Sequence, residues 1–293
     1  MPELPEVETV RRGLAPAMES GTVTRLELRR PDLRFPFPED FARRVEGQRV
    51  TSMGRRAKYL LADLEDGSVI IMHLGMSGSF RTEEEDGEAM PGEFHHARSR
   101  IEAHDHVIFH LTTSNGNATR VIYNDPRRFG FMLMTNRLEL QDHPMFRDMG
   151  VEPVGNALDA EELARKFVGK KAPLKAALLD QRVIAGLGNI YVCEALWRSN
   201  LSQKREARTL VTKSGKPTER LDRLTTNIRE TIAEAIEAGG SSLRDHAATD
   251  GTLGYFQHSF AAYDREDEPC RHEGCGKPIK RMFCINRGAV FIP

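Results

Sequence analysis

Apolar residues recur with a period of two along the first 135 residues, which is typical of half-buried strands. Turns rich in Gly, Asp and Asn, such as EDGS and SNGN, separate the alternating segments. These segments are 22–30, 49–54, 58–64, 68–76, 105–113 and 119–125. Short strands at this spacing predict a β-sandwich or barrel over roughly residues 20–135.

Helical periodicity opens the chain and dominates its second half. Behind Pro5, the residues Val7, Val10 and Leu14 recur at helical spacing, which predicts an amphipathic helix at the N-terminus. Helical patterns return at 157–167, 175–186, 189–199 and 218–239, and the last thirty residues are again aromatic and β-branched.

The two periodicities together predict an α+β protein with four regions. An N-terminal helix and β-sandwich occupy 1–135, a linker follows at 136–156, and a helical domain occupies 157–258. Within that domain, two helices joined by a glycine-containing turn form a helix–two-turn–helix. A C-terminal β-hairpin occupies 259–293.

Composition describes an ordinary globular protein, in which 39% of the 293 residues are hydrophobic and 29% are charged. The longest apolar run, near 69–76, falls short of the ~20 residues that a membrane helix needs. No charged and apolar leader opens the chain, and four cysteines in a chain of this length do not resemble an extracellular disulfide framework. We expect a cytoplasmic protein with no membrane partner.

The net charge of −1 conceals local basic segments. Residues 165–175 and 270–293 are rich in Lys and Arg, whereas residues 83–93 are acidic. Concentrated basic segments are compatible with a nucleic-acid-binding face, and solvated helix faces would look similar.

Two turns in the predicted sandwich carry side chains that are difficult to bury. Met76 lies between glycines in HLGMSGSF, and Arg127, Arg128 and Phe129 share the turn of NDPRRFGF. An exposed Met, Arg and Phe can enter a base stack and occupy vacated space, although a Met at a strand end is more often part of a core.

A third turn, VIAGLGNIY, joins two predicted helices. Gly186 and Gly188 allow close approach of a backbone, and Asn189 begins the following helix, whose free N–H groups suit a phosphate. Taken alone, such a sequence is more often only a turn.

The N-terminal stretch MPELPEVETV raises a separate question. A helix start accounts for Pro5 and for the carboxylates of Glu6 and Glu8, but it does not account for Pro2 and Glu3, which precede the helix.

In this order and spacing, the motifs resemble the formamidopyrimidine-DNA glycosylase family over essentially the whole chain. The motifs that carry the resemblance are PELPEVET, GRRAKYLL, HLGMSGSF, DPRRFG, LLDQRVIAGLGNIY, SSLRDH…DGTLGYFQ and a Cys-bearing basic tail. The resemblance implies a bifunctional DNA glycosylase and abasic-site lyase of base excision repair. It would act as a monomer on oxidised purines, chiefly 8-oxoguanine and formamidopyrimidines, in double-stranded DNA with the damaged base flipped out.

The resemblance also implies roles for individual residues. Pro2, freed by removal of the initiator Met, would be the nucleophile; its secondary amine would form a cationic Schiff base that permits β,δ-elimination. Glu3 would be the general acid/base, Lys58 would transfer protons during β-elimination, and Arg287 would serve δ-elimination. The DNA contacts implied by position are Met76, His104, Arg127, Phe129, Lys171, Asn189 and Tyr191. Residues 241–254 resemble the loop that closes over the everted purine.

The C-terminal region departs from the family pattern. Members of the family end in a hairpin that binds zinc through two cysteine pairs; here Cys270 and Cys275 supply one pair, and no second pair follows Phe291. We therefore expect a degenerate zinc finger with zinc incomplete or absent, and no organic cofactor.

Two other functions are weighed against this one. An endonuclease VIII-like enzyme would prefer oxidised pyrimidines, which PELPE and the loop sequence disfavour. A damaged-DNA-binding protein without catalysis is disfavoured by the presence of Pro2, Glu3 and Lys58.

Overall fold

The protein is described here by a computed structural model covering residues 1–293 except 85–100, 242–253, 285–286 and 292–293. Side chains are also not described from Met282 onward. The chain divides into two compact units. Unit 1 contains Met1–Arg147 and Ala238–Tyr255, and unit 2 contains Asp148–Glu237 and Phe256–Pro293.

Unit 1 is a β-sandwich of two four-stranded antiparallel sheets. One sheet has the order β1 (Thr22–Leu28), β6 (Asp105–Thr112), β7 (Ala118–Asn124) and β5 (Ser79–Glu84). The other has the order β2 (Val50–Arg56), β3 (Tyr59–Leu64), β4 (Ser68–His73) and β8 (Phe131–Asn136). The α+β class and the sandwich predicted from the sequence are confirmed.

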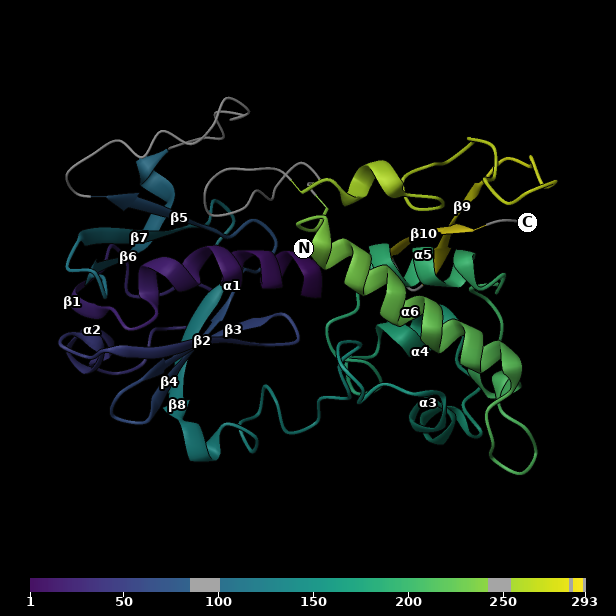
Figure 1. Cartoon of the computed structure of the whole chain (residues 1–293), viewed down its shortest axis with the longest axis horizontal. Helices are drawn as coiled ribbons and strands as arrows, with labels where there is room; N and C mark the ends of the chain where they lie inside the picture. The colour runs from purple at the N-terminus through teal and green to yellow at the C-terminus, as the bar shows by residue number, and fades with distance from the viewer. Residues whose placement is uncertain (85–100, 242–253, 285–286, 292–293) are drawn as a thin grey trace. The chain divides into compact units, whose positions relative to one another are not determined.

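Helix α1 (Leu4–Met18) packs against strands of both sheets, among them β2 and β5 (Figure 1). Its buried face includes Val7, Val10, Leu14 and Met18, the spacing that predicted the helix. These side chains join one core that includes strand residues of both sheets, so the start of α1 is held at a fixed place in the sandwich. A short helix, α2 (Phe41–Val45), packs against β1.

Two strands of the sandwich were not predicted. Strand β8 has an almost uninterrupted apolar run, FMLM, which lacks the alternation used as the criterion. Strand β5 reads SFRTEE and places its charged residues in cross-strand ion pairs: Arg81 pairs with Asp105 at 2.7 Å, and Glu83 pairs with Arg120 at 2.6 Å. Because most residues of this strand are charged or polar, the sequence pattern did not indicate that its Phe80 is buried.

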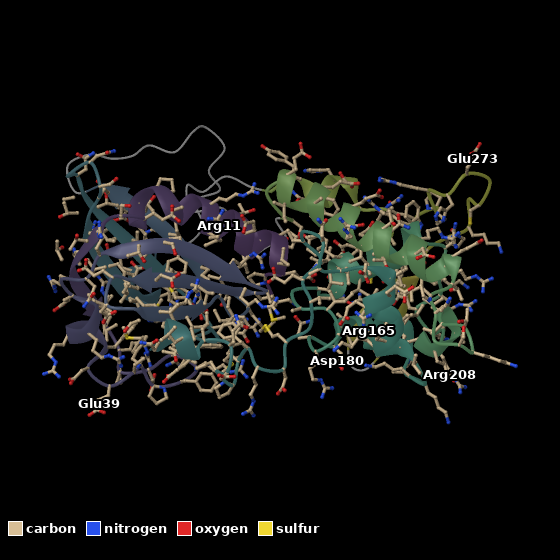
Figure 2. The ribbon with its side chains drawn as sticks, turned by 60° about the horizontal axis from the view of Figure 1, so that its bottom comes forward. Arg11, Glu39, Arg165, Asp180, Arg208 and Glu273 are labelled. Carbon is tan, nitrogen blue, oxygen red and sulfur yellow. The ribbon has the colours of Figure 1, made fainter. Side chains whose placement is uncertain are left out.

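Unit 2 contains α3 (Ala160–Phe167), α4 (Leu174–Leu179), α5 (Asn189–Arg198) and α6 (Glu219–Glu237), followed by the hairpin of β9 (Lys280–Cys284) and β10 (Arg287–Phe291). Helix α5 packs against α4, α6 and β10. In Figure 2, Arg165 lies on α3, Asp180 directly after α4, and Arg208 in the 3-10 turn η3 (Ala207–Leu210). Among the described residues no helix is long and apolar enough to cross a membrane.

The observed units divide the chain differently from the predicted domains. The expected linker 136–156 is divided between the units at Arg147 and Asp148, and the expected hairpin region 259–293 falls in unit 2. Ala238–Tyr255, expected in the helical domain 157–258, falls in unit 1. The physical reason is that the backbone N–H and the hydroxyl of Ser241 both donate to Glu6 on α1, at 2.8 and 2.9 Å. Of the loop expected to close over the purine, residues 242–253 lie outside the described chain.

Candidate active site and nucleic-acid interface

The N-terminal segment is buried and held by hydrogen bonds. Pro2 and Glu3 are both buried immediately before α1, and the backbone N–H of Glu3 donates to Oε2 of Glu6 at 2.8 Å. Because Oε1 of Glu6 accepts the two bonds from Ser241, one carboxylate fixes both the residue after Pro2 and the chain at 241. Met1 is exposed and precedes Pro2, so the Pro2 nitrogen becomes an amine only when Met1 is removed.

Lys58 lies in the two-residue turn between β2 and β3. The preceding Ala57 adopts a left-handed conformation with φ of 53°, and its carbonyl accepts a hydrogen bond of 2.8 Å from Arg55. Arg55 also pairs with Glu8 of α1 at 3.3 Å, so this turn is tied to the helix that carries Pro2 and Glu3 at its start. Lys58 is only 7% exposed, which argues against a freely solvated lysine.

Strand register brings three turns to one end of the sandwich. Tyr59 of β3 pairs with His73 of β4, and His73 pairs with Phe131 of β8. The residues directly beyond this row are the Lys58 turn, the turn 74–78 and the end of the turn 125–130. The last two connect the sheets: 74–78 runs from β4 to β5, and 125–130 runs from β7 to β8.

The turns 74–78 and 125–130 expose apolar side chains. Met76 is 37% exposed and Phe129 is 43% exposed, and the Arg127 guanidinium lies 4.9 Å from the centroid of the Phe129 ring. We call Met76, Arg127 and Phe129 the wedge residues. Exposed large apolar side chains gathered on adjoining turns are suited to insertion into an apolar partner.

His73 and His104 flank these turns. His73 stacks on Phe131 with ring centroids 5.1 Å apart, and its Nδ1 accepts the N–H of Gly75 at 3.0 Å. Burial, followed by the charges of Lys58 and Arg34, lowers the pKa of His73 to about 4, so its imidazole is neutral at pH 7. The carbonyl of His104 accepts the N–H of Asp125 at 3.0 Å, which places His104 beside the turn 125–130.

In unit 2, the predicted helix 175–186 ends at Leu179, and the residues before α5 form a turn, 180–188. Asp180 ends the helix because its carboxylate accepts the N–H of Arg182 at 3.1 Å. The side chain of Gln181 holds the remainder of this turn. Its amide NH2 group donates to the backbone carbonyls of Leu179 and Leu187 at 3.1 and 2.9 Å, and its amide oxygen accepts the backbone N–H of Gly186 at 2.8 Å. Gly186 has φ of 97°, which favours glycine.

Helix α5 begins at Asn189 with Gly188 as its N-cap, and no side chain caps it. The Asn189 side-chain oxygen is buried and has no hydrogen-bond partner among the described residues. The positive end of the helix dipole and an uncapped first turn suit a phosphate group. Lys171, in the loop before α4, is exposed.

The structure buries the ring of Tyr191 inside unit 2. Tyr191 is only 1% exposed and packs against Phe256 with ring centroids 5.6 Å apart, so its ring belongs to the core of unit 2. Arg287 lies in β10, where its Cα pairs with Cys284, and its side chain lies outside the described part.

Cys270 and Cys275 are the C-terminal cysteines whose side chains the structure describes. The Sγ of Cys270 accepts the backbone N–H of His272 at 3.3 Å, and Cys270 packs with Ile279, Trp197 and Cys275. His272 stacks on Trp197 with centroids 4.0 Å apart. Among the described residues, no three His, Cys, Asp or Glu side chains are grouped to hold a metal. Packing against Trp197 and Ile279 therefore supplies contacts of this segment.

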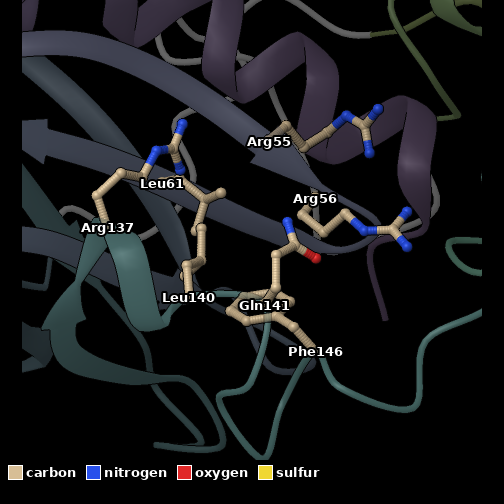
Figure 3. A pocket seen from close by; sticks show the side chains of 7 residues that line it. All are labelled: Arg55, Arg56, Leu61, Arg137, Leu140, Gln141 and Phe146. Carbon is tan, nitrogen blue, oxygen red and sulfur yellow. The ribbon is translucent and has the colours of Figure 1, made fainter.

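A shallow pocket of about 370 Å³ lies on the sandwich beside β2 (Figure 3). Its lining residues are Arg55, Arg56, Leu61, Arg137, Leu140, Gln141 and Phe146. Two of its arginines are engaged in ion pairs, Arg55 with Glu8 and Arg137 with Asp63 at 3.1 Å.

Sequence reasoning missed His73, Gln181 and Glu194. Glu194 of α5 is wholly buried and accepts the N–H groups of Ala261, Ala262 and Tyr263, at 2.9, 3.0 and 2.7 Å. A glutamate within the apolar run of YVCEALW was the available signal, because such a carboxylate must find donors. The partners of Glu194 lie far along the chain, whereas those of Gln181 lie within six residues of it.

Comparison with known families covers both units. A model of the formamidopyrimidine-DNA glycosylase N-terminal domain matches residues 1–132, and a model of the formamidopyrimidine-DNA glycosylase H2TH domain matches residues 149–247. A formamidopyrimidine-DNA glycosylase of Rhizobium johnstonii is 63% identical over 291 residues, covering 99% of this chain and 98% of the relative. One from Chelativorans sp. is 60% identical over 293 residues, covering 100% of this chain and 99% of the relative.

Solved structures give the same result. The MutM (Fpg) protein of Thermus thermophilus superposes with a TM-score of 0.80 at 37% identity, covering 100% of this chain and 97% of that one. The Lactococcus lactis Fpg (MutM) in complex with DNA containing N7-benzyl-Fapy-dG superposes with a TM-score of 0.82 at 29% identity, covering 100% and 98%.

Proposed function

The chain belongs to the formamidopyrimidine-DNA glycosylase family, and on that premise we propose that Pro2, Glu3 and Lys58 carry out its chemistry on a damaged nucleotide flipped out of double-stranded DNA. The chain is a DNA glycosylase with abasic-site lyase activity, and damaged DNA is its partner. The observation that carries the residue-level proposal is the buried Pro2–Glu3 segment, held at the start of α1 by Glu6.

The proposed substrates are oxidised purines, namely formamidopyrimidines and 8-oxoguanine opposite cytosine. The names of the relatives and the Fapy-dG in the Lactococcus lactis complex support this class. Because such lesions arise in the chromosome, we place the enzyme in the cytoplasm with the nucleoid.

The first chemical step is attack by the Pro2 nitrogen on C1′. The C1′–N9 bond breaks, and the base leaves with the bonding electrons and takes up a proton. Glu3 accepts the proton that the nitrogen loses and passes it to O4′ as the C1′–O4′ bond opens. The product is a cationic iminium between Pro2 and C1′, which is the electron sink for the eliminations.

Elimination then cleaves the strand. Loss of a C2′ proton delivers electrons to the iminium and expels the 3′ phosphate, and Lys58 moves this proton. Arg287 serves the second elimination, at the 5′ phosphate. The link from Glu8 through Arg55 to the Lys58 turn supports a fixed position for Lys58 relative to α1.

The wedge residues and unit 2 provide DNA binding. Met76, Arg127 and Phe129 fill the space that the flipped nucleotide vacates, which offsets part of the few kcal/mol that unstacking costs. His104 contacts the backbone near this turn. In unit 2, Lys171 and the start of α5 at Asn189 bind phosphate groups.

Borohydride trapping tests the nucleophile. The mature protein should give a covalent adduct with duplexes carrying 8-oxoguanine or an abasic site, and little with thymine glycol. A form that retains Met1, or a tag before Pro2, should give no adduct, because its Pro2 nitrogen is an amide. The melting temperature should be unchanged, which separates loss of chemistry from loss of fold. Trapping by the blocked form at the wild-type rate would assign the nucleophile to another residue.

A further inference from the structure

Asp125 begins the turn 125–130, and its carboxylate has no exposed surface (0%). Aspartates are almost never fully buried unless they are paired or hydrogen-bonded, because desolvation of the charge is costly. The chemistry proposed above uses Arg127 and Phe129 from the same turn but gives Asp125 no part.

Four donors from two turns and a strand surround this carboxylate. Its Oδ1 accepts from the hydroxyl of Ser77 at 2.6 Å and from the N–H of Arg127 at 3.2 Å. Its Oδ2 accepts from the N–H of Gly130 at 2.8 Å and from the hydroxyl of Tyr123 at 3.2 Å. Bonds to an ionised acceptor are stronger than those between neutral groups.

These bonds join the two turns that expose the wedge residues. Arg127 and Gly130 belong to the turn 125–130, whereas Ser77 belongs to the turn 74–78 and directly follows Met76. One buried carboxylate therefore fixes the position of Met76 relative to Arg127 and Phe129, although these residues are some fifty positions apart in the sequence.

Backbone packing between the turns makes them one body. A Cβ on Gly75 would collide with the backbone of Phe129 and Gly130, and a Cβ on Gly130 would collide with the hydroxyl of Tyr123. Arg128 is held at φ of 56°, a conformation that a non-glycine residue adopts only when its surroundings impose it. Neither turn can shift without displacing the other.

We propose that Asp125 is a positioning residue for lesion recognition, which holds the turns 74–78 and 125–130 as a single preformed wedge. The inference rests on the proposed function of the wedge residues. Met76 and Phe129 are partly exposed on two separate turns. If the backbone of these turns is ordered before DNA binds, insertion does not lose affinity to the entropy of ordering them.

The variant Asp125→Asn tests this role. An amide keeps the shape but has one acceptor oxygen, so it cannot serve both pairs of donors, and its NH2 group would face a donor. Affinity for a duplex carrying 8-oxoguanine opposite cytosine should fall about tenfold, and affinity for a duplex carrying a tetrahydrofuran abasic analogue by about threefold or less. The fluorescence of 2-aminopurine next to the lesion, which reports unstacking, should fall in the bound complex.

Asp63→Asn is the matched control. Asp63 is a buried carboxylate of the same unit; it accepts from Ser52 at 2.9 Å and pairs with Arg137, at the end of β3 remote from both turns. The Asp63→Asn variant should lower the melting temperature. The ratio of the affinity for the 8-oxoguanine duplex to the affinity for the abasic-analogue duplex should stay unchanged. If Asp125→Asn does not fold, Ser77→Ala, which removes one donor between the turns, should change the ratio in the same direction by about twofold to threefold.

A double-mutant cycle with Phe129→Ala distinguishes positioning from general stability. If Asp125 acts through the wedge, Asp125→Asn should change the affinity ratio by no more than about twofold in the Phe129→Ala background. Additive effects in the cycle, or an unchanged ratio in Asp125→Asn and Ser77→Ala, would overturn the inference while leaving the function of the wedge intact. A Phe129→Ala variant with a wild-type ratio would instead overturn the proposed function on which it rests.

Discussion

The turns 125–130 in unit 1 and 180–188 in unit 2 are organised by different chemistry. In the first, the Asp125 carboxylate accepts backbone N–H groups from within the turn. In the second, the neutral amide of Gln181 donates to two carbonyls and accepts one N–H. Both turns need glycine at a close approach or a positive φ, Gly130 in one and Gly186 in the other.

On the proposed function, the two turns meet different parts of the DNA. The turn 125–130 presents an arginine and an aromatic ring at its surface, while the Asp125 carboxylate is buried and is engaged by hydrogen-bond donors. The turn 180–188 leads into a helix start suited to phosphate, where an unpaired carboxylate would repel the ligand. The one carboxylate there, Asp180, is paired with Arg182 at 2.9 Å and Lys170 at 3.7 Å, and the bond from Arg182 lowers its pKa.

The largest expected effect comes from Glu3→Gln in unit 1, and it falls on the chemical step and not on DNA binding. Glu3→Gln should reduce excision of 8-oxoguanine by ~10²–10⁴-fold, because the amide cannot carry the proton to O4′. Cleavage at preformed abasic sites should fall much less, since the Pro2 amine can attack an open-chain aldehyde. Single-turnover rates on the two substrates measure this, with the exposed Glu39→Gln as control (Figure 2). Equal loss of both rates would make Glu3 a structural residue.

The next effect in size is acid destabilisation of unit 1 through His73. The unfolded chain binds a proton at His73 below pH 6.5, whereas the folded chain does so only near pH 4, so stability is present above 6.5 and is lost as the pH falls toward 4. The shift corresponds to roughly 3 kcal/mol. Urea unfolding between pH 7.5 and 4 should show this loss, and His73→Gln should reduce it. A pH profile unaltered by the substitution would assign the acid sensitivity to other groups.

Much of this contrast could be predicted from the sequence, and part could not. The turns that carry the wedge residues followed from local patterns, because Gly and Pro punctuate turns. The turn 180–188 followed only in part: a turn was expected at VIAGLGNIY, but the helix predicted over 175–186 ends at Leu179. The residues that organise these turns could not be predicted from such patterns. Asp125 looks like an ordinary turn aspartate, and its partner Ser77 becomes visible only when two sheet crossovers meet in space. The burial of Tyr191 likewise depends on Phe256, some sixty-five positions along the chain.

Gln181→Ala should produce a smaller effect, confined to binding. Loss of three hydrogen bonds loosens the turn 180–188, and we expect the Kd for lesion DNA to rise about tenfold while the cleavage rate of bound DNA is unchanged. Gln181→Glu should weaken binding further, and more so at low salt, because it adds a negative charge near the phosphate. The exposed Gln141→Ala in unit 1 is the matched control. A change in the rate but not in the Kd would show that the turn serves chemistry.

The smallest effect should come from removing metal, and it extends the comparison to the C-terminal segment of unit 2. A structural zinc site uses four ligands, whereas Cys270 is engaged with the His272 backbone and packed against Trp197 and Ile279. Contacts of the protein itself, including the three hydrogen bonds to Glu194, should carry the stability of this segment. Elemental analysis should find substoichiometric zinc, and EDTA should move the melting temperature by less than about 2 °C. Stoichiometric zinc in the wild-type protein that is lost in the Cys270→Ser variant would instead show that a metal organises this segment, just as the Asp125 carboxylate organises the wedge turns.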